Sequence, residues 1–191
     1  MKPAQSQGCR IISRCRISGD SNLVPVLNLG EQSLTGVFPK NTGTHLSKGP
    51  LELVWCPASG LLQLHHSFDP QEMYGEGYGY RSGLNPSMVE HLQAKARRLE
   101  RQCQLRGGDV VLDIGSSDAT LLKAYQVAGL ERIGMDPSAE KYRSYYSDGI
   151  HLVADFFSKQ AFEKNMATKR PRLITSVAMF YDLEDPVGFA G

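Results

Sequence analysis

The residue pattern with the clearest chemical meaning is a short apolar run that ends in an acidic turn. Residues 110–114 read Val-Val-Leu-Asp-Ile, which is rich in β-branched residues and too short for a helix, so it predicts a buried strand. Gly115 breaks the run, and a helical pattern follows over residues 118–128. A strand, a small-residue turn and a helix offer free backbone N–H groups to the polar end of a ligand. Asp113 and Asp118 add two carboxylates, which distinguishes this turn from an ordinary connection.

The spacing within the turn narrows the class of ligand. A dinucleotide-binding turn has the pattern G-x-G-x-x-G, but counting from Gly115 the later positions hold Ser117 and Thr120. No Gly-Lys-Ser/Thr follows, which excludes a P-loop. An acid, a glycine and small polar residues such as Ser116 fit S-adenosylmethionine (SAM), which has no pyrophosphate. Its ammonium and sulfonium groups suit a carboxylate such as Asp113.

A second acid follows a second strand-like run. Residues 132–136 read Arg-Ile-Gly-Met-Asp and end about 20 residues after the turn, where the ribose of a bound nucleoside is expected. Asp136, which Pro137 follows, can accept hydrogen bonds from both ribose hydroxyls. A third run ends at Asp155 and Phe156, where contacts with the adenine ring are expected. The pair of acids therefore favours SAM, and the missing glycines argue against an NAD-dependent oxidoreductase.

Strand-like and helical patterns alternate through this half of the chain. Such alternation predicts an α/β fold with a parallel, doubly wound, Rossmann-like sheet. The fourth strand would lie beside the first as an uncovered apolar edge, so we expect the chain to be a fragment. The predicted strands span residues 110–114, 132–136, 151–156 and 172–180, and the predicted helices span residues 118–128, 138–147 and 158–166.

A longer helix is predicted just before the first of these strands. Ser87 and Glu90 have the spacing of a capping box, in which each side chain accepts a hydrogen bond from a free backbone N–H. The apolar positions that follow lie on one helical face as far as Cys103, and glycines end the pattern.

Residues 9–70 read as short strands and turns that bury little apolar surface, so the region needs a covalent or metal staple. Cys15-Arg-Ile-Ser-Gly19 and Cys56-Pro-Ala-Ser-Gly60 have the frame of two zinc knuckles, with serine at each second cysteine position. Cys15 and Cys56 supply two ligands, and structural zinc takes four. The residues that would have to complete the set are Cys9, His65 or His66. The sequence therefore favours a degenerate knuckle, and Zn²⁺ is a doubtful cofactor.

Residues 71–86 hold tyrosines and glycines around one arginine, a composition with two interpretations. The segment is a packed loop over a core, or its phenols and guanidinium bind a polar, phosphate-bearing substrate. The candidate substrate-loop residues are Tyr74, Tyr78, Tyr80, Arg81 and Ser82.

The composition of the whole chain excludes several functional classes. The 191 residues carry 21 Lys and Arg against 20 Asp and Glu, a formal charge of +1, which gives no electrostatic basis for binding nucleic acid or an anionic membrane. No apolar run is long enough to span a bilayer, and the N-terminus lacks the apolar core of a signal peptide. We therefore expect a cytoplasmic protein, and the sequence leaves its oligomeric state open.

In combination, these motifs resemble the N-terminal half of the SAM-dependent sugar C-methyltransferases, which methylate a ring carbon of nucleotide-linked keto-deoxysugars. The matching pieces are the paired knuckle frames, Pro50-Leu51-x-Leu53-x-x-Cys56, Gly60-Leu-Leu-Gln-Leu64, Met73-Tyr-Gly, Tyr78-Gly-Tyr-Arg-Ser-Gly83 and Asp113-Ile-Gly-Ser-Ser-Asp-Ala-Thr-Leu-Leu122. The resemblance implies a zinc-binding module at residues 9–70, a substrate loop at residues 71–86 and a SAM-binding methyltransferase domain at residues 87–191.

The resemblance also implies roles for individual residues. Tyr78 and Tyr80 would lie near the sugar, where a phenol can hydrogen-bond an enolate oxygen, and the substrate contacts would be Tyr74, Arg81 and Ser82. The family's catalytic His-Glu-His stretch would lie beyond Gly191, so the 191 residues are expected to be inactive alone. The alternative is a non-catalytic remnant or a SAM-binding module. Two departures from the family are the knuckle serines, Ser18 and Ser59, and the alanine Ala119, which replaces a glycine and would place a methyl group near the cofactor.

Overall fold

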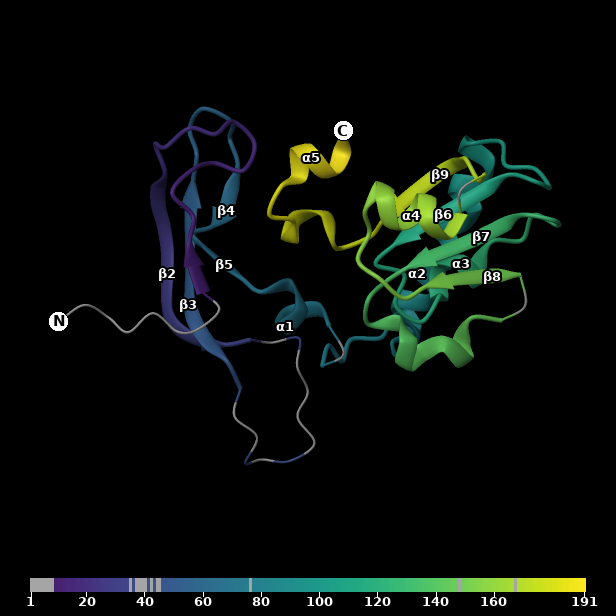
Figure 1. The fold of residues 1–191 in the computed structure, drawn as a ribbon, viewed down its shortest axis with the longest axis horizontal. Coiled ribbons are helices and arrows are strands. Elements are labelled where there is room, and N and C mark those ends of the chain that lie inside the picture. The colour runs from purple at the N-terminus through teal and green to yellow at the C-terminus, as the bar shows by residue number, and fades with distance from the viewer. Residues whose placement is uncertain are drawn as a thin grey trace. The chain divides into compact units, whose positions relative to one another are not determined.

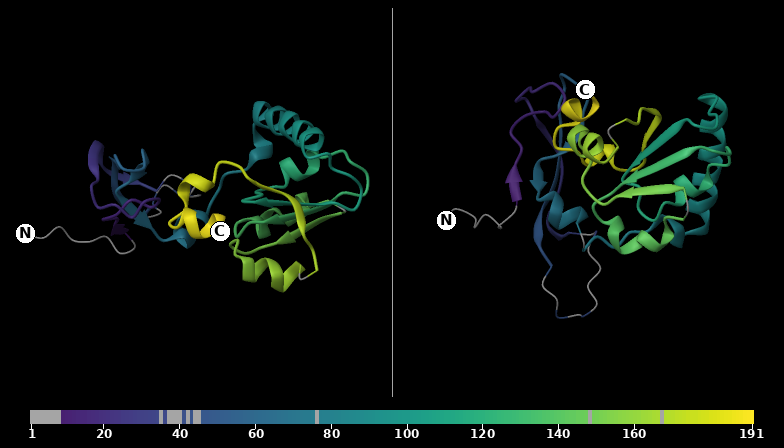
Figure 2. Two further views of the ribbon diagram at one scale, coloured as in Figure 1. Left: turned by 90° about the horizontal axis from the view of Figure 1, so that it is seen from above. Right: turned by 45° about the vertical axis from the view of Figure 1, so that its right-hand side comes forward.

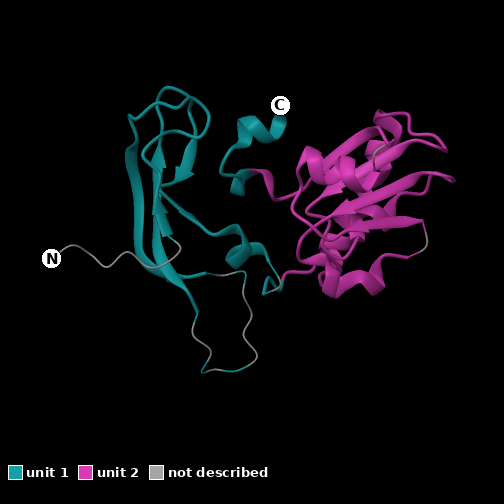
Figure 3. Ribbon diagram, viewed as in Figure 1, with its two compact units in different colours: residues 1–79, 181–191 teal, residues 80–180 magenta. Residues whose placement is uncertain are grey.

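The computed structural model describes residues 9–34, 36, 41, 43, 46–75, 77–147, 149–166 and 168–191. Residues 1–8, on which the expectation about a signal peptide depends, lie outside these residues. The chain forms two compact units, one of residues 1–79 and 181–191 and the other of residues 80–180 (Figure 3). The boundary between the units divides the proposed substrate loop at residues 71–86.

The second unit is built on a four-stranded parallel sheet. Its strands are β6 (Val110–Ile114), β7 (Glu131–Met135), β8 (Ile150–Val153) and β9 (Pro171–Ser176), in the spatial order β8-β7-β6-β9 (Figure 1). Each pairing in this sheet is parallel. The predicted α/β class and parallel sheet are thus confirmed, as is the position of the fourth strand beside the first. The arrangement is that of a Rossmann-like fold.

Helices flank this sheet. Figure 2 shows α2 (Pro86–Gln102) and α4 (Lys159–Met166) on opposite faces of it. The shorter helical segments are η1 (Ser82–Leu84), α3 (Thr120–Ala124) and η2 (Ala139–Tyr145). Side chains of α2, α3 and β6 form one hydrophobic core, whose members include Leu92, Ala96, Val111, Leu121 and Leu122. This core fixes the strand and the helix on either side of the candidate SAM turn.

Several predicted boundaries in this unit were wrong. The helix predicted over residues 118–128 is the five-residue α3, because the backbone becomes extended at Tyr125. The segment predicted as a helix over residues 138–147 is the 3₁₀ helix η2. The strands predicted to end at Phe156 and Phe180 end at Val153 and Ser176.

The predicted capping box was also wrong. The N-cap of α2 is Asn85, whose side chain accepts a hydrogen bond from the Ser87 N–H at 3.1 Å. Pro86 occupies the first helical position, where its fixed φ and missing N–H cost nothing. The cap therefore falls on the residue before the proline and not on Ser87.

The first unit is a small assembly of antiparallel strands. β2 (Val24–Ser33), β3 (Lys48–Trp55) and β4 (Leu62–Leu64) form one sheet in that order, and β1 (Cys9–Ile11) pairs with β5 (His66–Phe68). The remaining segments are α1 (Pro70–Tyr74), η3 (Phe180–Asp182), which begins in the other unit, and α5 (Pro186–Ala190). Among the residues of this unit that the structure describes, few hydrophobic side chains are fully buried, and these include Val54 and Cys56. Within the described part of the chain, no helix is long and apolar enough to cross a membrane.

Candidate cofactor-binding turn and cysteine knuckles

The turn after β6 is held in an unusual backbone conformation. Gly115, Ser117 and Ala119 have φ values of +76°, +49° and +59°. Glycine adopts a positive φ freely, whereas a residue with a β-carbon pays roughly 1–2 kcal/mol. The methyl group of Ala119 is fully buried in the hydrophobic core. The positive φ of Ala119 shows that the alanine at this position acts on the backbone of the turn; that the methyl group lies near the cofactor stays a prediction.

Asp136 links this turn to the loop after β7. Its Oδ2 accepts a hydrogen bond from the Ser117 N–H at 2.8 Å. Its Oδ1 accepts from the N–H and the hydroxyl of Ser138, both at 2.7 Å. The carboxylate is 8% exposed, and Pro137 beside it is half-buried. Asp136 thus fixes the relative positions of two loops at the carboxyl edge of the sheet.

Asp113 lies one step deeper, inside β6. Its Oδ1 accepts a hydrogen bond from the Thr175 hydroxyl of β9 at 2.7 Å. Burial, together with the nearby charge of Asp136, raises the pKa of Asp113 to about 7, although the Thr175 hydrogen bond opposes the rise. A carboxyl group in this state takes up or releases a proton near neutral pH, and a bound cation would favour its ionised form.

Tyr146 completes the support of the turn, a role that no sequence motif indicates. Its hydroxyl donates to the Ser117 carbonyl at 2.9 Å and lies 2.7 Å from Ser116 Oγ. Burial is the main cause that raises the pKa of Tyr146, so its phenol stays protonated. A β-carbon on Gly134 would lie 2.5 Å from Ser116 Oγ, so glycine is needed there. The Ser116 hydroxyl is therefore engaged by the protein itself.

Asp118 faces the segment that precedes α2. Its Oδ2 accepts from the Gly83 N–H at 3.0 Å and lies 3.3 Å from Arg81 Nε. Its Oδ1 accepts from the Thr120 hydroxyl at 2.5 Å. A β-carbon on Gly83 would lie 2.5 Å from Asp118 Oδ2, so only glycine permits this approach. The structure brings Asp118 together with Arg81, a pairing that the sequence did not suggest.

Two cations and an aromatic ring border a hollow beside this pair. Arg81 Nη1 donates to the Tyr145 hydroxyl at 2.6 Å, and the guanidinium lies 4.6 Å from the centre of the Tyr145 ring. Lys123 Nζ lies 5.3 Å from the same ring. The hollow has a volume of about 270 Å³, and Gln93 and Thr120 are among its lining residues. It offers positive charge, an aromatic face and hydrogen-bonding groups to a polar ligand.

The structure separates the tyrosines of the proposed substrate loop. Tyr74 and Tyr78 lie in the first unit with their rings edge to face at 5.5 Å, and burial and Asp182 raise the pKa of Tyr74. Tyr80 lies in the second unit and is 44% exposed. Ser82 begins η1 and is half-buried.

Two of the predicted cofactor contacts lie past the end of β8. Asp155 is exposed, and its Oδ1 accepts a hydrogen bond from the N–H of Phe156, which is half-buried. Both residues follow the carboxyl end of β8, the strand next to β7; their contact with an adenine ring stays a prediction.

The two knuckle frames fold alike. The Gly19 N–H donates to the Cys15 carbonyl at 2.9 Å, and the Gly60 N–H donates to the Cys56 carbonyl at 2.8 Å. Gly19 and Gly60 both have positive φ, at +72° and +75°. The glycines that the frames share are thus required by the turn, and both turns keep the knuckle shape without their second cysteines.

The knuckle side chains pair across the two turns. Cys15 Sγ lies 3.1 Å from Ser59 Oγ, and Cys56 Sγ lies 3.6 Å from Ser18 Oγ. Burial opposes ionisation of Cys15, but hydrogen bonds from Ser18 and Ser59 outweigh it and lower the pKa of the thiol to about 6. All four cysteines are free thiols. The four positions therefore converge, as the paired frames predicted.

This donor set does not fit structural zinc. Such sites are closed by four Cys or His ligands, and a serine hydroxyl is a poor ligand beside a thiolate. Here the convergent groups are two thiols and two hydroxyls, and the hydroxyls already hydrogen-bond to the sulfurs.

Two comparisons with known protein sequences bear on the family of this chain. Residues 15–74 match the sequence family described as "putative zinc binding domain" of methyltransferases. The chain is also 24% identical over 180 residues to the C-methyltransferase NovU of Streptomyces niveus, a match that covers 92% of this chain and 42% of the relative. The chain thus spans less than half the length of that relative. The predicted resemblance to the N-terminal region of a C-methyltransferase is confirmed.

Proposed function

We propose that residues 80–180 bind SAM at the turn after β6, as the cofactor half of a C-methyltransferase that acts on a nucleotide-linked keto-deoxysugar. The observation that carries this proposal is the position of Asp136, whose carboxylate joins the turn after β6 to the loop after β7. In parallel α/β sheets, ligands bind outside the carboxyl ends of the strands where the strand order reverses. The order β8-β7-β6-β9 reverses at β6.

The residues around the turn after β6 can be matched to the ribose, the positive charge, the adenine and the polar end of SAM. Asp136 already accepts three hydrogen bonds from the protein, which leaves about one acceptor site, on Oδ2, for a ribose hydroxyl, with Pro137 beside it. Asp113 can offset the positive charge of the cofactor, and Asp155 and Phe156 lie past the next strand, toward the adenine. Gly115, Ser116 and Ser117 are the proposed contacts with the polar end of the cofactor. The Gly115 and Ser117 N–H groups already donate to the Met135 carbonyl and to Asp136, so the Ser116 N–H is the backbone donor proposed for the ligand. SAM supplies an electrophilic methyl group when it is bound.

The substrate side of the proposal rests on the segment around Arg81. Arg81, Lys123 and the Asp118 carboxylate border the hollow, and Arg81 pairs with Asp118. The positive charge that remains beside Lys123 can attract a diphosphate group, which is the proposed polar part of the substrate. Methylation of a carbon next to a ketone requires removal of its proton and stabilisation of the enolate oxygen. Tyr78 and Tyr80 are the proposed phenol donors to that oxygen, with Tyr74 and Ser82 as further substrate contacts. Among the described residues we assign no base for the proton.

The knuckle region has a structural role in this proposal. The paired Cys–Ser contacts tie the turn at Cys15 to the turn at Cys56 and take the place of a zinc ion. No catalytic step depends on this region.

Calorimetric titration of the 191-residue chain with SAM tests the proposal. Asp136→Asn keeps the shape of the side chain but weakens its acceptor capacity, so SAM affinity should fall by about 1.5–3 kcal/mol, or at least tenfold. The matched control is Glu140→Gln, since Glu140 is an exposed acid that pairs with Arg143. The control should bind SAM as the wild type does. Absence of SAM binding by the folded wild type, or equal affinity in Asp136→Asn, would contradict the proposed cofactor site.

A further inference from the structure

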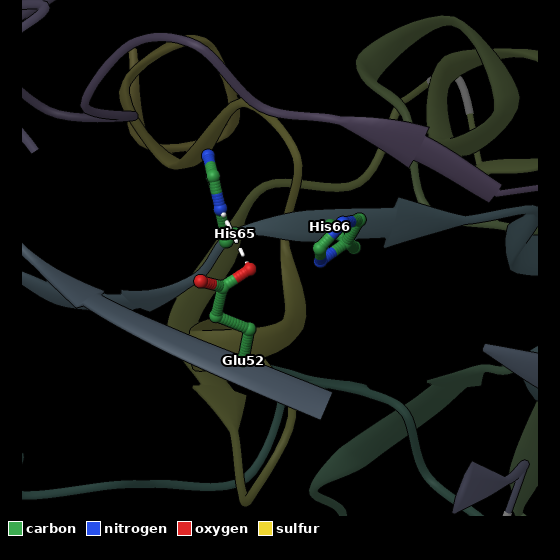
Figure 4. Close-up of side chains that lie close together, drawn as sticks. All are labelled: Glu52, His65 and His66. Carbon is green, nitrogen blue, oxygen red and sulfur yellow. Dashed lines mark hydrogen bonds and ion pairs between the residues drawn. The ribbon is translucent and has the colours of Figure 1, made fainter. Parts of the chain in front are cut away.

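Besides the two knuckle turns at Cys15 and Cys56, the first unit contains another group of side chains that can bind a metal. Glu52 belongs to β3, His65 follows β4, and His66 begins β5. Figure 4 shows the three side chains gathered at this point. One ligand atom from each lies within 4.8 Å of the other two. Two imidazoles and a carboxylate are ligands that a divalent transition metal accepts.

The backbone and side chains of Glu52 and His65 already have a suitable spacing. The His65 N–H donates to the Glu52 carbonyl at 2.9 Å, which fixes the two residues side by side. His65 Nδ1 lies 3.0 Å from Glu52 Oε2. Ligand atoms about 2.0–2.1 Å from a tetrahedral zinc ion lie roughly 3.3–3.5 Å from one another. A small movement would therefore let both atoms bind one ion.

The ion pair between Glu52 and His65 does not account for the environment of His66. His66 is only 9% exposed. Its Nδ1 is buried and has no hydrogen-bond partner among the described residues. A buried polar atom without a partner is costly. One of the two ring nitrogens of His66 lies within 4.8 Å of the ligand atoms of Glu52 and His65, so an ion there would bind the ring.

We propose that Glu52, His65 and His66 bind one divalent transition-metal ion, with zinc as the natural occupant. All three residues fall within the region that matches the zinc-binding family, yet none of them is a knuckle position. Three protein ligands leave a fourth position for water. The ion would join β3 to β5 and so staple the two small antiparallel sheets, in a unit whose knuckles hold only two thiols.

Cobalt(II) titration of the metal-free, full chain tests this site, because its spectrum reports the ligand type. We expect one cobalt per chain, with visible d–d absorption, no thiolate-to-cobalt charge-transfer band, and release of cobalt when zinc is added. Glu52→Gln and His66→Gln should each weaken binding more than roughly 100-fold, because even outer-shell partners of a metal are worth 10–100-fold. His151→Asn is the matched control, since His151 is exposed and lies in the second unit.

Cys15→Ser with Cys56→Ser separates the proposed site from the knuckles and should leave cobalt binding unchanged. A charge-transfer band that this double variant abolishes would place the ion in the knuckles and overturn the proposal. Unchanged affinity in both Glu52→Gln and His66→Gln, or no cobalt binding by the wild type, would also overturn it. Circular dichroism of the metal-free variants confirms that each is folded; if His66→Gln is not, the isosteric Glu52→Gln decides the outcome. None of these measurements depends on SAM.

Discussion

The Thr175 hydroxyl donates a hydrogen bond of 2.7 Å to Asp113 Oδ1 and so ties β9 to β6 where the candidate SAM turn begins. Asp113 is almost fully buried, and no cationic side chain is among the causes that set its pKa. Burial therefore dominates, and the carboxyl group titrates at about pH 7. Ionisation of the buried Asp113 carboxyl group therefore costs free energy unless a positively charged ligand is bound beside it.

This relationship predicts how stability depends on pH. Because the folded-state pKa of Asp113 is raised from 3.8 to about 7, the unfolded chain loses its proton first as the pH rises. The contribution of Asp113 to the free energy of unfolding is complete below about pH 4 and is lost up to pH 7. At about 1.4 kcal/mol per pH unit, the wild type should lose on the order of 2 kcal/mol between pH 5 and pH 8. Urea unfolding of Asp113→Asn should show a much smaller loss.

The control for that experiment is Asp155→Asn, because Asp155 is exposed and should leave the pH profile unchanged. If Asp113→Asn and the wild type lose stability in parallel between pH 5 and pH 8, Asp113 is ionised in the folded state throughout.

Two buried alanines of the same core provide a test of the strain in the turn. Ala119 and Ala96 are both fully buried, but Ala119 has φ of +59° and Ala96 lies inside α2. Ala96→Gly should cost roughly 2 kcal/mol, from about 1 kcal/mol of helix propensity and about 0.8 kcal/mol of lost burial. Ala119→Gly loses the same burial but gains about 1 kcal/mol from the relieved backbone, so its net effect should be near zero. Chemical unfolding measures both variants, and equal losses would show that the turn is unstrained.

The start of α2 gives a third prediction. Asn85→Ala removes the side chain that caps the Ser87 N–H and should destabilise the second unit by about 1 kcal/mol. Glu90→Ala should change stability by less than about 0.5 kcal/mol, because the capping box predicted from Ser87 and Glu90 does not form. Thermal unfolding compares the stability of the two variants. A larger loss of stability in Glu90→Ala than in Asn85→Ala would show that the capping box does form.

The parts of the fold that the sequence predicted well are those that depend on local patterns. Residues 110–114 form β6 as predicted, and the strand predicted at residues 132–136 is shifted by a single residue. Each run carries its apolar residues in a short segment flanked by turn residues, so the strand type was correct in both cases and the boundaries were correct to within one residue. The helix after β6 was predicted too long because Ala119 takes a positive φ, which delays the helix to Thr120, and Tyr125 ends it.

The support of the candidate site could not be predicted, because it joins residues that are distant in the chain. Tyr146 reaches Ser117 across 29 positions, and Arg81 reaches Asp118 across 37. Neither pair has a spacing that a motif would reveal. The knuckle frames were visible in the sequence, but the pairing of each cysteine with the serine of the opposite turn depends on how the strands between them fold.

That crossed pairing leads to the last prediction, which concerns Ser18→Cys combined with Ser59→Cys. In a four-thiolate zinc site with bonds of about 2.3 Å, neighbouring sulfurs lie roughly 3.8 Å apart. The present distances are 3.1 Å from Cys15 Sγ to Ser59 Oγ and 3.6 Å from Cys56 Sγ to Ser18 Oγ. Cysteine thiolates in place of the two serine hydroxyls would therefore lie close to the sulfur spacing of a four-thiolate zinc site. In a His66→Gln background, which removes the site proposed above, the double variant should bind one zinc per chain.

At a zinc concentration 100 times the dissociation constant, this binding should raise the free energy of unfolding of the first unit by about 2.7 kcal/mol. Elemental analysis counts the bound zinc, and cobalt substitution should now produce the thiolate charge-transfer band. Ser18→Ala with Ser59→Ala is the control: it removes both hydroxyls, adds no ligand and should bind no zinc at the knuckles. If the double cysteine variant gains neither zinc nor stability, the four knuckle positions do not converge closely enough to share one ion. The hydrogen-bonded Cys–Ser pairs would then be two separate contacts and not the remaining frame of a metal site.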